Sequence, residues 1–204
     1  MKETGRFITL EGGEGTGKST QVKRLAKALE AKKIKVVITR EPGGAPGAEE
    51  IRKLMVEGEP GRWNPITETL LAYAARADHV ARTIGPALTA GRWVISDRFS
   101  DSTYAYQGVG RGVERETIRR IDSAVLDDFA PDLILVSAGF DAHARDPLAH
   151  QGLEAEDFAW ATRAIVSVAR RRCGGKLVST LEGGYDLRGL ADSATAHLRA
   201  LQGE

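Results

Sequence analysis

Residues 7–21 constrain the fold of this chain more than any other stretch, because they read FITLEGGEGTGKSTQ. Four residues that favour β-structure precede a Gly-rich turn, and a segment with helical periodicity follows it. The turn fits the pattern G-x-x-x-x-G-K-[ST], in which backbone N–H groups surround a phosphate and the positive end of a helix dipole faces it. The turn therefore predicts a site for the phosphates of a nucleoside triphosphate, made of Gly12, Gly13, Glu14, Gly15, Thr16, Gly17, Lys18, Ser19 and Thr20.

Two residues of this turn have side chains with a chemical role in the pattern. The Lys18 ammonium reaches the β- and γ-phosphates, and the Ser19 hydroxyl is a ligand for Mg²⁺. A Gly-rich turn that matches the pattern by chance is the alternative. The strand before the turn and the helix after it favour the phosphate site, because they are the context that the pattern requires.

The composition and net charge indicate which kinds of binding partner are unfavoured for this chain. The chain has 204 residues, and 29 Lys and Arg residues against 28 Asp and Glu residues give a net charge of +1. This balance does not favour a nucleic-acid or membrane surface, and no apolar run approaches the ~18 residues of a membrane helix. The single cysteine, Cys173, excludes an internal disulfide and a Cys-rich zinc site, and it fits a reducing cytoplasm.

Strand and helix patterns alternate along the whole chain. Short apolar runs predict strands at residues 7–10, 35–39, 93–96, 132–137 and 176–181. After the helix that follows the turn, helical periodicity predicts helices at residues 48–56, 67–88 (bent near Gly85-Pro86), 114–126, 154–172 and 187–201, and residues 100–111 are predicted as loop. This alternation predicts an α/β fold: one P-loop NTPase-type domain, residues 1–204, with a five-stranded parallel sheet and helices on both faces.

Four motifs in a fixed order give the chain a resemblance to a known family. They are FITLEGGEGTGKSTQ, TREPGG at residues 39–44, LAYAARADHV at residues 71–80, and DRFSDSTYAYQGVGRG at residues 97–112. Together they resemble bacterial thymidylate kinase over about residues 5–133. The resemblance implies transfer of the γ-phosphoryl group of ATP to dTMP, with Mg²⁺ as cofactor, and it implies a homodimer.

The resemblance also assigns roles by motif position. It implies that Lys18, Asp97 and Arg98 are the catalytic residues, and that Asp97 organises Mg²⁺ together with Ser19. Arg52 and Arg98 would hold the acceptor phosphate, since arginine forks suit phosphate oxygens. The full set implied to contact dTMP is Glu14, Arg52, Tyr73, Arg76, Arg98, Ser102, Thr103 and Tyr106.

The remaining contacts concern the nucleoside. The resemblance implies that Glu14 accepts from the 3′-hydroxyl, that Arg76 donates to a thymine carbonyl, and that Tyr106 blocks a ribose 2′-hydroxyl. Ser102 and Thr103 would line the base. Taken alone, each residue has a plainer interpretation as an exposed helix arginine, a strand-end ion pair or a packed tyrosine. The joint match of the four motifs is what favours the site.

One position departs from the family pattern. In the family, an aromatic residue four positions before the base-binding arginine stacks on thymine. Here that position is Ala72, and the aromatic residue is Tyr73, three positions before Arg76. Either the helix is locally shifted or the stacking is weakened. Since stacking of a base on an aromatic ring contributes about 1–3 kcal/mol, the departure is expected to affect the affinity for dTMP.

The last third of the chain resembles a different family. DLILVSAGFDAHARDPLA (residues 132–149) and KLVSTLEGGYDLRGLADS (residues 176–193) are similar to the carboxyl-terminal part of the histone deacetylase and acetylpolyamine amidohydrolase family. This resemblance, over about residues 128–204, implies a chimera. Residues 1–131 would be kinase-like, and residues 132–204 would supply the last two strands of the sheet. Because badly fitted core side chains cost about 1–3 kcal/mol each, we expect a marginally stable fold.

The deacetylase-like segments do not predict a zinc site. In that family, the residue matching Asp141 is a zinc ligand and the residue matching Tyr185 polarises the acetyl carbonyl. A catalytic zinc needs three protein ligands, and the chain lacks both the earlier ligands and the His-His pair of that family. We therefore expect no zinc.

The tail also replaces a segment that matters for kinase catalysis. In thymidylate kinases, a lid after the fourth strand supplies arginines to the transferred phosphoryl group when the phosphate loop has none, as here. The corresponding residues 140–153 contain only Arg145; Arg163 and residues 170–172 fall on the next helix. Because such an arginine contributes about 10³–10⁵ to the rate in related reactions, we expect reduced or absent turnover. The alternatives are a nucleotide-binding protein without catalysis and, with less support, a zinc-dependent deacetylase fragment.

Overall fold

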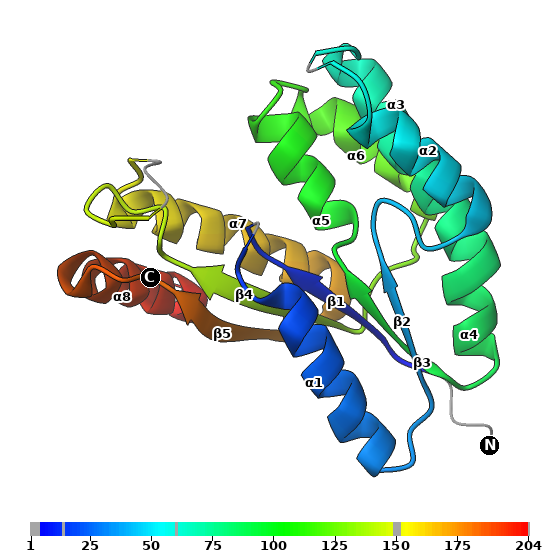
Figure 1. Cartoon of the computed structure of the whole chain (residues 1–204), viewed down its shortest axis with the longest axis horizontal. Helices are drawn as coiled ribbons and strands as arrows, with labels where there is room; N and C mark the ends of the chain where they lie inside the picture. The colour runs from blue at the N-terminus through cyan, green and yellow to red at the C-terminus, as the bar shows by residue number, and fades with distance from the viewer. Residues whose placement is uncertain (1–4, 14, 60, 149–151, 204) are drawn as a thin grey trace. The chain divides into compact units, whose positions relative to one another are not determined.

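The computed structural model describes residues 5–13, 15–59, 61–148 and 152–203. The chain forms two compact units. The first consists of the chain up to Glu11 together with Ser19–Asp132, and the second of Gly12–Lys18 together with the chain from Leu133 onward. Figure 1 shows the helices and strands of both units.

The first unit contains three parallel strands in the order β2-β3-β1. Their bounds are Phe7–Glu11 for β1, Val36–Arg40 for β2 and Trp93–Asp97 for β3. All five residues of β1 are buried, which explains why its sequence is β-favouring throughout and does not alternate with polar residues. Leu10 and Arg40 both pair in register with Asp97, so the carboxyl ends of the strands lie at one edge, where ligand groups collect in parallel sheets.

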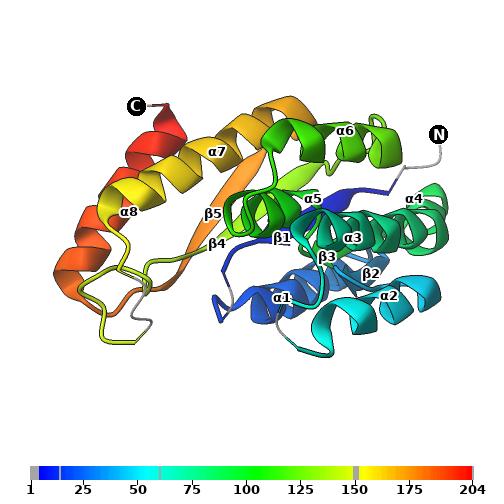
Figure 2. The same ribbon diagram turned by 90° about the horizontal axis from the view of Figure 1, so that it is seen from above.

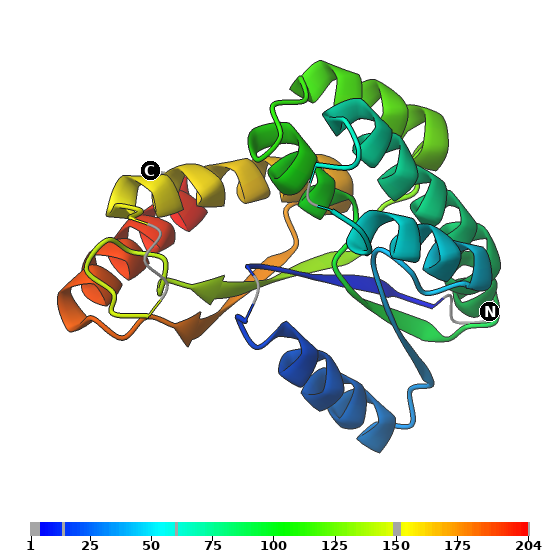
Figure 3. The same cartoon turned by 45° about the horizontal axis from the view of Figure 1, so that its top comes forward.

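Helical segments flank these strands. In α1, the buried residues Val22 and Ala26 lie four positions apart and define the apolar face that the sequence predicts. Figure 3 shows α1 on one face of the three strands and α3 and α6 on the other. The helical segments of this unit are α1 (Lys18–Ala31), α2 (Pro46–Val56), α3 (Pro65–His79), η1 (Val80–Ile84), α4 (Gly85–Thr89), α5 (Ser100–Thr103), η2 (Tyr104–Val109) and α6 (Arg115–Leu126).

The predicted long helix is a continuous run of α3, η1 and α4, and its irregular part is the π-helical turn η1. This turn ends directly before Gly85-Pro86, where the sequence predicts a bend. Pro86 cannot donate a backbone hydrogen bond, so the regular i to i−4 pattern is interrupted near this point.

Residues 100–109 are helical, as α5 and η2, whereas the sequence analysis predicts a loop. The prediction is wrong here because the buried side chains of the segment are polar. Ser100, Thr103 and Gln107 are buried at intervals of three and four residues, so a search for apolar periodicity does not detect the helix. Their polar groups find partners within the unit, as when Gln107 Nε2 donates to Glu68 Oε1 at 2.8 Å.

The core of the first unit is apolar and rich in aromatic rings. Phe7 and Phe99 lie edge to face, with ring centres 5.0 Å apart. Ile84, Val94 and Leu126 are buried in the same cluster. The core thus joins β1 and β3 to η1, to α6 and to the segment after β3.

The second unit contains β4 (Leu133–Gly139) and β5 (Leu177–Gly183), which pair in parallel. Its helices are α7 (Ala155–Cys173) and α8 (Leu187–Gln202), which lie side by side in Figure 2. Gly174 ends α7 in the left-handed conformation, which glycine adopts readily at a helix end. The core is formed by β4 residues such as Ile134 and Val136 against α7, β5 and α8.

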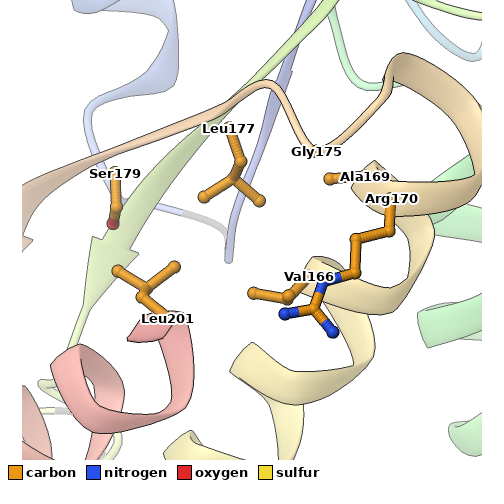
Figure 4. A pocket seen from close by; sticks show the side chains of 7 residues that line it. All are labelled: Val166, Ala169, Arg170, Gly175, Leu177, Ser179 and Leu201. Atoms are coloured by element: carbon orange, nitrogen blue, oxygen red, sulfur yellow. The ribbon is translucent and has the colours of Figure 1, made fainter. Parts of the chain in front are cut away.

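A cavity of about 270 Å³ lies in the second unit. Figure 4 shows the side chains around it, which come from α7, β5 and the end of α8. They are Val166, Ala169, Arg170, Gly175, Leu177, Ser179 and Leu201. Apolar side chains and the polar groups of Arg170 and Ser179 line this space, which is partly open to solvent.

The α/β class and the five parallel strands predicted from the sequence are confirmed, with the strands distributed as three and two over the two units. Among the residues that the structure describes, no helix is both long and apolar enough to cross a membrane.

Candidate functional site

The Gly-rich turn belongs to the second unit. Two of its side chains donate hydrogen bonds to one backbone carbonyl of the same turn. The Gly13 carbonyl accepts from Lys18 Nζ and, at 2.8 Å, from Thr16 Oγ1. Ser137, on β4, donates its hydroxyl hydrogen to the Thr16 carbonyl. These bonds hold the turn in a compact loop. Glu14, which the sequence analysis places in this loop, lies outside the described residues.

Two glycines of the loop are required by their surroundings. Gly17 has a φ of +73°, and a Cβ atom there would lie 2.6 Å from the Glu182 carboxylate. A Cβ atom at Gly12 would lie 2.5 Å from the Ser137 carbonyl oxygen. Glycine at position 17 is therefore required by its left-handed φ, and glycine at position 12 by the close backbone of Ser137.

A hydroxyl group and a carboxylate lie next to each other in the first unit. Ser19 Oγ donates to Asp97 Oδ2 at 3.1 Å. The other carboxylate oxygen, Asp97 Oδ1, is buried and has no hydrogen-bond partner among the described residues. Mg²⁺ is bound in proteins through one or two carboxylates together with substrate phosphates and water. The hydroxyl and the orphaned carboxylate oxygen fit such an ion. Thr20, the next residue, is exposed.

Arg98 follows β3 in an unusual backbone conformation, with a φ of +74°. This conformation costs about 1–2 kcal/mol for a residue with a Cβ atom. Its backbone is held on both sides, since Arg98 N donates to Leu10 O at 2.9 Å and Arg98 O accepts from Ser96 Oγ at 2.8 Å. The Arg98 guanidinium lies 5.0 Å from the centre of the Tyr106 ring. The strained turn thus sets the direction of a cationic side chain.

Arg76, on α3, is almost completely buried, with 3% of its surface exposed. Its Nε donates to Glu41 Oε2 at 2.7 Å, and its Nη2 donates to Phe99 O at 3.2 Å and to Thr103 Oγ1 at 3.1 Å. Its Nη1 is buried and has no hydrogen-bond partner among the described residues. A buried, unpaired N–H donor is costly, so the site is suited to an acceptor from a ligand.

Glu41 connects this arginine to a second buried group. Its other oxygen, Oε1, lies 3.1 Å from His79 Nδ1, and His79 Nε2 lies 2.6 Å from Thr39 Oγ1. Glu41 and His79 are both buried. The sequence analysis names neither, although Glu41 falls inside the TREPGG motif. A charged residue directly after an apolar strand is the signal that could have identified it.

The other residues that the family resemblance assigns to dTMP binding differ in their burial and in their partners. Tyr73 is 1% exposed, and its hydroxyl donates to Asp122 Oδ1 at 2.9 Å, so its ring belongs to the core of the first unit. Arg52 Nη1 donates to Pro42 O at 2.8 Å. Thr103 is buried, whereas Tyr106 is exposed.

Glu11 is a further acidic residue at this edge that the sequence analysis does not single out. It ends β1, is buried, and accepts from Phe99 N and from Ser102 Oγ, each at 2.8 Å. Burial raises the pKa of Glu11 from 4.5 to about 8, and the negative charge of Asp101 adds to this increase. The position of Glu11 at the end of an apolar strand is the feature of the sequence that could have identified it as a site residue.

The residues singled out by the deacetylase resemblance lie in the second unit. His143 is buried, and its Nδ1 accepts from Arg145 N at 3.1 Å. Tyr185 is 61% exposed, and its backbone N–H donates to Asp146. In the described part of the chain, no group of three or more His, Cys, Asp or Glu side chains is arranged to hold a metal ion.

Known proteins similar to this chain are thymidylate kinases. The family described as thymidylate kinase matches residues 10–159, which is more than half of the chain. A thymidylate kinase of Rhizorhabdus wittichii is 58% identical over 143 residues, 69% of this chain and 69% of that protein. One of Ruegeria pomeroyi is 54% identical over 136 residues, 67% of this chain and 64% of that protein.

A solved structure agrees with these relatives. The crystal structure of thymidylate kinase from Ehrlichia chaffeensis superposes with a TM-score of 0.68 at 29% identity, over 98% of each chain. The comparisons confirm the resemblance to thymidylate kinase and the expected enzyme class, a nucleoside monophosphate kinase. They do not support the deacetylase resemblance of the tail, since the family match continues past residue 131 to residue 159. The chain belongs to the thymidylate kinase family.

Proposed function

We propose that the chain phosphorylates dTMP to dTDP with ATP as the donor. The observation that carries this proposal is Arg76, whose Nη1 is buried and unpaired among the described residues while its other donors are held by Glu41, Phe99 and Thr103. A thymine carbonyl would satisfy that donor. In a member of the thymidylate kinase family, a buried donor at this motif position supports thymine as the base.

The phosphate loop is proposed to bind the triphosphate of ATP. Its backbone N–H groups and the start of α1 attract the phosphates, and the Lys18 ammonium neutralises charge on the β- and γ-phosphates. Ser19 and Asp97 are proposed to hold Mg²⁺, which the orphaned Asp97 Oδ1 supports. When bound, Mg²⁺ neutralises part of the charge that develops on the phosphates.

Two arginines are proposed to hold the acceptor phosphate. Phosphoryl transfer needs little covalent help from the protein; it needs alignment and charge neutralisation. Arg98 is directed by its strained turn, and Arg52 comes from α2, beside the Pro42 carbonyl. The dianionic phosphate of dTMP is suited to two guanidinium groups.

The side chains around Arg76 and Arg98 are proposed to contact the nucleoside part of dTMP or to orient the residues that do. Tyr73 acts through Arg76, which its ring supports at 4.6 Å. Thr103 accepts from Arg76 and so helps to orient it, and Ser102 lies next to it in α5. Tyr106 has an exposed ring that can exclude a 2′-hydroxyl. Glu14 is proposed to accept from the 3′-hydroxyl, by its motif position alone.

We also propose that one domain, residues 1–204, combines two sequence origins, with residues 1–131 kinase-like and residues 132–204 deacetylase-like. The motif resemblance of residues 132–149 and 176–193 is what supports this junction. Turnover would then be reduced, because the segment at the lid position, residues 140–153, contains only Arg145. This observation also favours a second candidate function, nucleotide binding without catalysis.

Nucleotide binding and turnover can be tested separately. Calorimetry should show binding of ATP with Mg²⁺ and of dTMP, and thermal unfolding should shift upward with both ligands, since ligands stabilise the native state that binds them. A coupled assay should then show slow ADP release that depends on dTMP. Binding of both nucleotides without any dTMP-dependent ADP release would favour the non-catalytic alternative. Absence of any thermal shift would contradict both functions.

The family resemblance and the composition also support proposals for the oligomeric state and the cellular compartment of the protein. We propose a homodimer in the cytoplasm, without a nucleic-acid or membrane partner. Light scattering at several protein concentrations tests the dimer, since a constant monomer mass would contradict it. Fractionation of cells that produce the protein tests the compartment.

A further inference from the structure

Glu11 is a buried carboxyl group that the proposed reaction does not use. It is 5% exposed at the carboxyl end of β1. Burial of a carboxyl group is unfavourable unless hydrogen bonds compensate, and both bonds of Glu11 go to one segment. Oε1 accepts from Phe99 N, and Oε2 accepts from Ser102 Oγ. The two hydrogen bonds of Glu11 therefore help to hold residues 98–103 in their conformation.

This segment begins with the strained residue of the site. Arg98 adopts its positive φ directly after β3, and Phe99, the next residue, is the first that Glu11 holds. Ser102, the second, also lies 3.4 Å from Arg98 Nη1 through its hydroxyl oxygen. Glu11 therefore fixes the backbone just beyond the strained turn and, through Ser102, a point beside the Arg98 guanidinium.

The same segment orients the second arginine of the site. The carbonyl of Phe99 accepts from Arg76 Nη2 at 3.2 Å, and Thr103 Oγ1 accepts from the same nitrogen at 3.1 Å. The peptide unit of Phe99 is therefore shared, since its N–H is held by Glu11 and its carbonyl is held by Arg76. A shift of this residue would move both arginines that are proposed to contact dTMP.

We propose that Glu11 is a positioning residue for dTMP binding, which holds residues 98–103 so that Arg98 and Arg76 face the acceptor nucleotide. This inference rests on the proposed function. It assigns to Glu11 an effect on dTMP that is not expected for ATP, because the contacts of Glu11 lie on the acceptor-binding segment.

The charges around Glu11 determine which substitutions are informative. Arg98 and Asp101 face it, with opposite effects on its ionisation, and burial outweighs both in raising its pKa to about 8. At neutral pH the group is therefore mostly protonated. Glutamine has the same shape and a carbonyl oxygen for Phe99 N–H, so Glu11→Gln keeps the bond to the shared peptide unit, while its amide donates to Ser102 Oγ in place of accepting from it. Glu11→Leu keeps the size and removes the acceptor.

The test compares these two variants with a control at the other end of β1. Asp132 accepts from Phe7 N at 2.8 Å, as Glu11 accepts from Phe99 N, but its side-chain hydrogen bonds go to Arg6 and Phe7 and not to residues 98–103. Calorimetry with dTMP and, separately, with ATP and Mg²⁺ is carried out at pH 7 on the wild type and on Glu11→Gln, Glu11→Leu and Asp132→Ala. Circular dichroism establishes that each protein is folded.

Glu11→Leu should weaken dTMP binding at least ~10-fold and leave ATP binding within ~2-fold. Glu11→Gln should bind dTMP within ~3-fold of the wild type, and Asp132→Ala should leave the dTMP affinity unchanged even if it is less stable. Equal dTMP affinity of folded Glu11→Leu and wild type would overturn the inference. If Glu11→Leu does not fold, Glu11→Gln decides alone: a loss of more than ~10-fold at pH 7 would mean that charge, not the hydrogen-bonded geometry, is what matters. A wild-type protein that binds no dTMP would instead contradict the proposed function.

Discussion

The Arg76 guanidinium lies over the Tyr73 ring, with 4.6 Å between Cζ and the ring centre, and both side chains are almost completely buried. A cation over an aromatic face is attracted by the ring quadrupole, more strongly when both groups are desolvated. The hydroxyl of Tyr73 is anchored by Asp122. The aromatic residue that the sequence places one position from the family pattern is therefore seated beneath the arginine, and Ala72 occupies the position where the family has a ring.

Substitution of Tyr73 should separate its two contacts. Tyr73→Phe keeps the ring under Arg76 but removes the buried hydrogen bond from Tyr73 to Asp122 Oδ1, so the free energy of unfolding should fall by about 1–3 kcal/mol while dTMP affinity stays within ~2-fold. Tyr73→Leu also removes the ring, and dTMP affinity should fall by a further ~3- to 10-fold. Urea denaturation and calorimetry measure the two effects. Equal dTMP affinities of the Phe and Leu variants would show that the ring does not support Arg76.

Loss of the Glu41 carboxylate should destabilise the first unit strongly. Glu41→Ala leaves the Arg76 guanidinium buried without its 2.7 Å partner, and breaking such a pair by removal of one member costs about 3–5 kcal/mol. The exposed pair of Arg119 and Glu116 is the control. Glu116→Ala should cause no measurable change, because exposed ion pairs contribute little. Thermal unfolding of both variants measures the difference, and a similar small effect for both would contradict the structural role of Glu41.

Most of the helices and strands were accessible from the sequence, because each rests on local patterns. The strand at 7–10 and the turn that follows it have their own signatures in residue type and spacing. The proposed acceptor site rests instead on motif resemblance, since Arg52, Arg76 and Arg98 are separated by 24 and 22 positions in the sequence. No periodicity relates residues at such spacings, so local patterns in the sequence do not predict their contacts.

The features that the sequence did not predict are polar side chains that are buried because other parts of the chain supply their hydrogen-bond partners. The helix at 100–109 is invisible to apolar periodicity because Thr103 and Gln107 are its buried residues. The Glu41 carboxylate accepts from Arg76, 35 positions away, and Glu11 accepts from Phe99, 88 positions away. Residue type alone predicts that such charged groups are exposed, and only the tertiary fold supplies the donors that make their burial tolerable.

Stability should depend on pH through Glu11. Its pKa is raised from 4.5 to about 8, mainly by burial, so the folded protein binds this proton more tightly than the unfolded chain. The contribution is complete below pH 4.5 and is lost as the pH rises towards about 8. Urea denaturation at pH values from 6 to 8.5 should therefore show a free energy of unfolding that decreases with pH more steeply for the wild type than for Glu11→Gln. Parallel pH profiles of the two proteins would exclude this contribution, because all other titrating groups are common to both.

The cavity in the second unit should accept added volume. Val166 points into this space in Figure 4, together with Leu177 and Leu201. Val166→Ile adds one methylene group that can fill part of the 270 Å³ without displacing neighbours, and each buried methylene contributes about 0.8 kcal/mol. The free energy of unfolding should therefore rise by about 0.5–1 kcal/mol.

Val168, two positions along the same helix, provides the matched control for this substitution. It packs directly against the apolar core of the second unit and is not among the residues that line the cavity. Val168→Ile adds the same group where the packing is already complete, so it should be neutral or cost about 1–3 kcal/mol through overpacking. Urea denaturation followed by circular dichroism measures both variants. If Val166→Ile is as destabilising as Val168→Ile, the space beside α7 is not available to an apolar side chain, and the marginal packing expected of the carboxyl-terminal segment has a different origin.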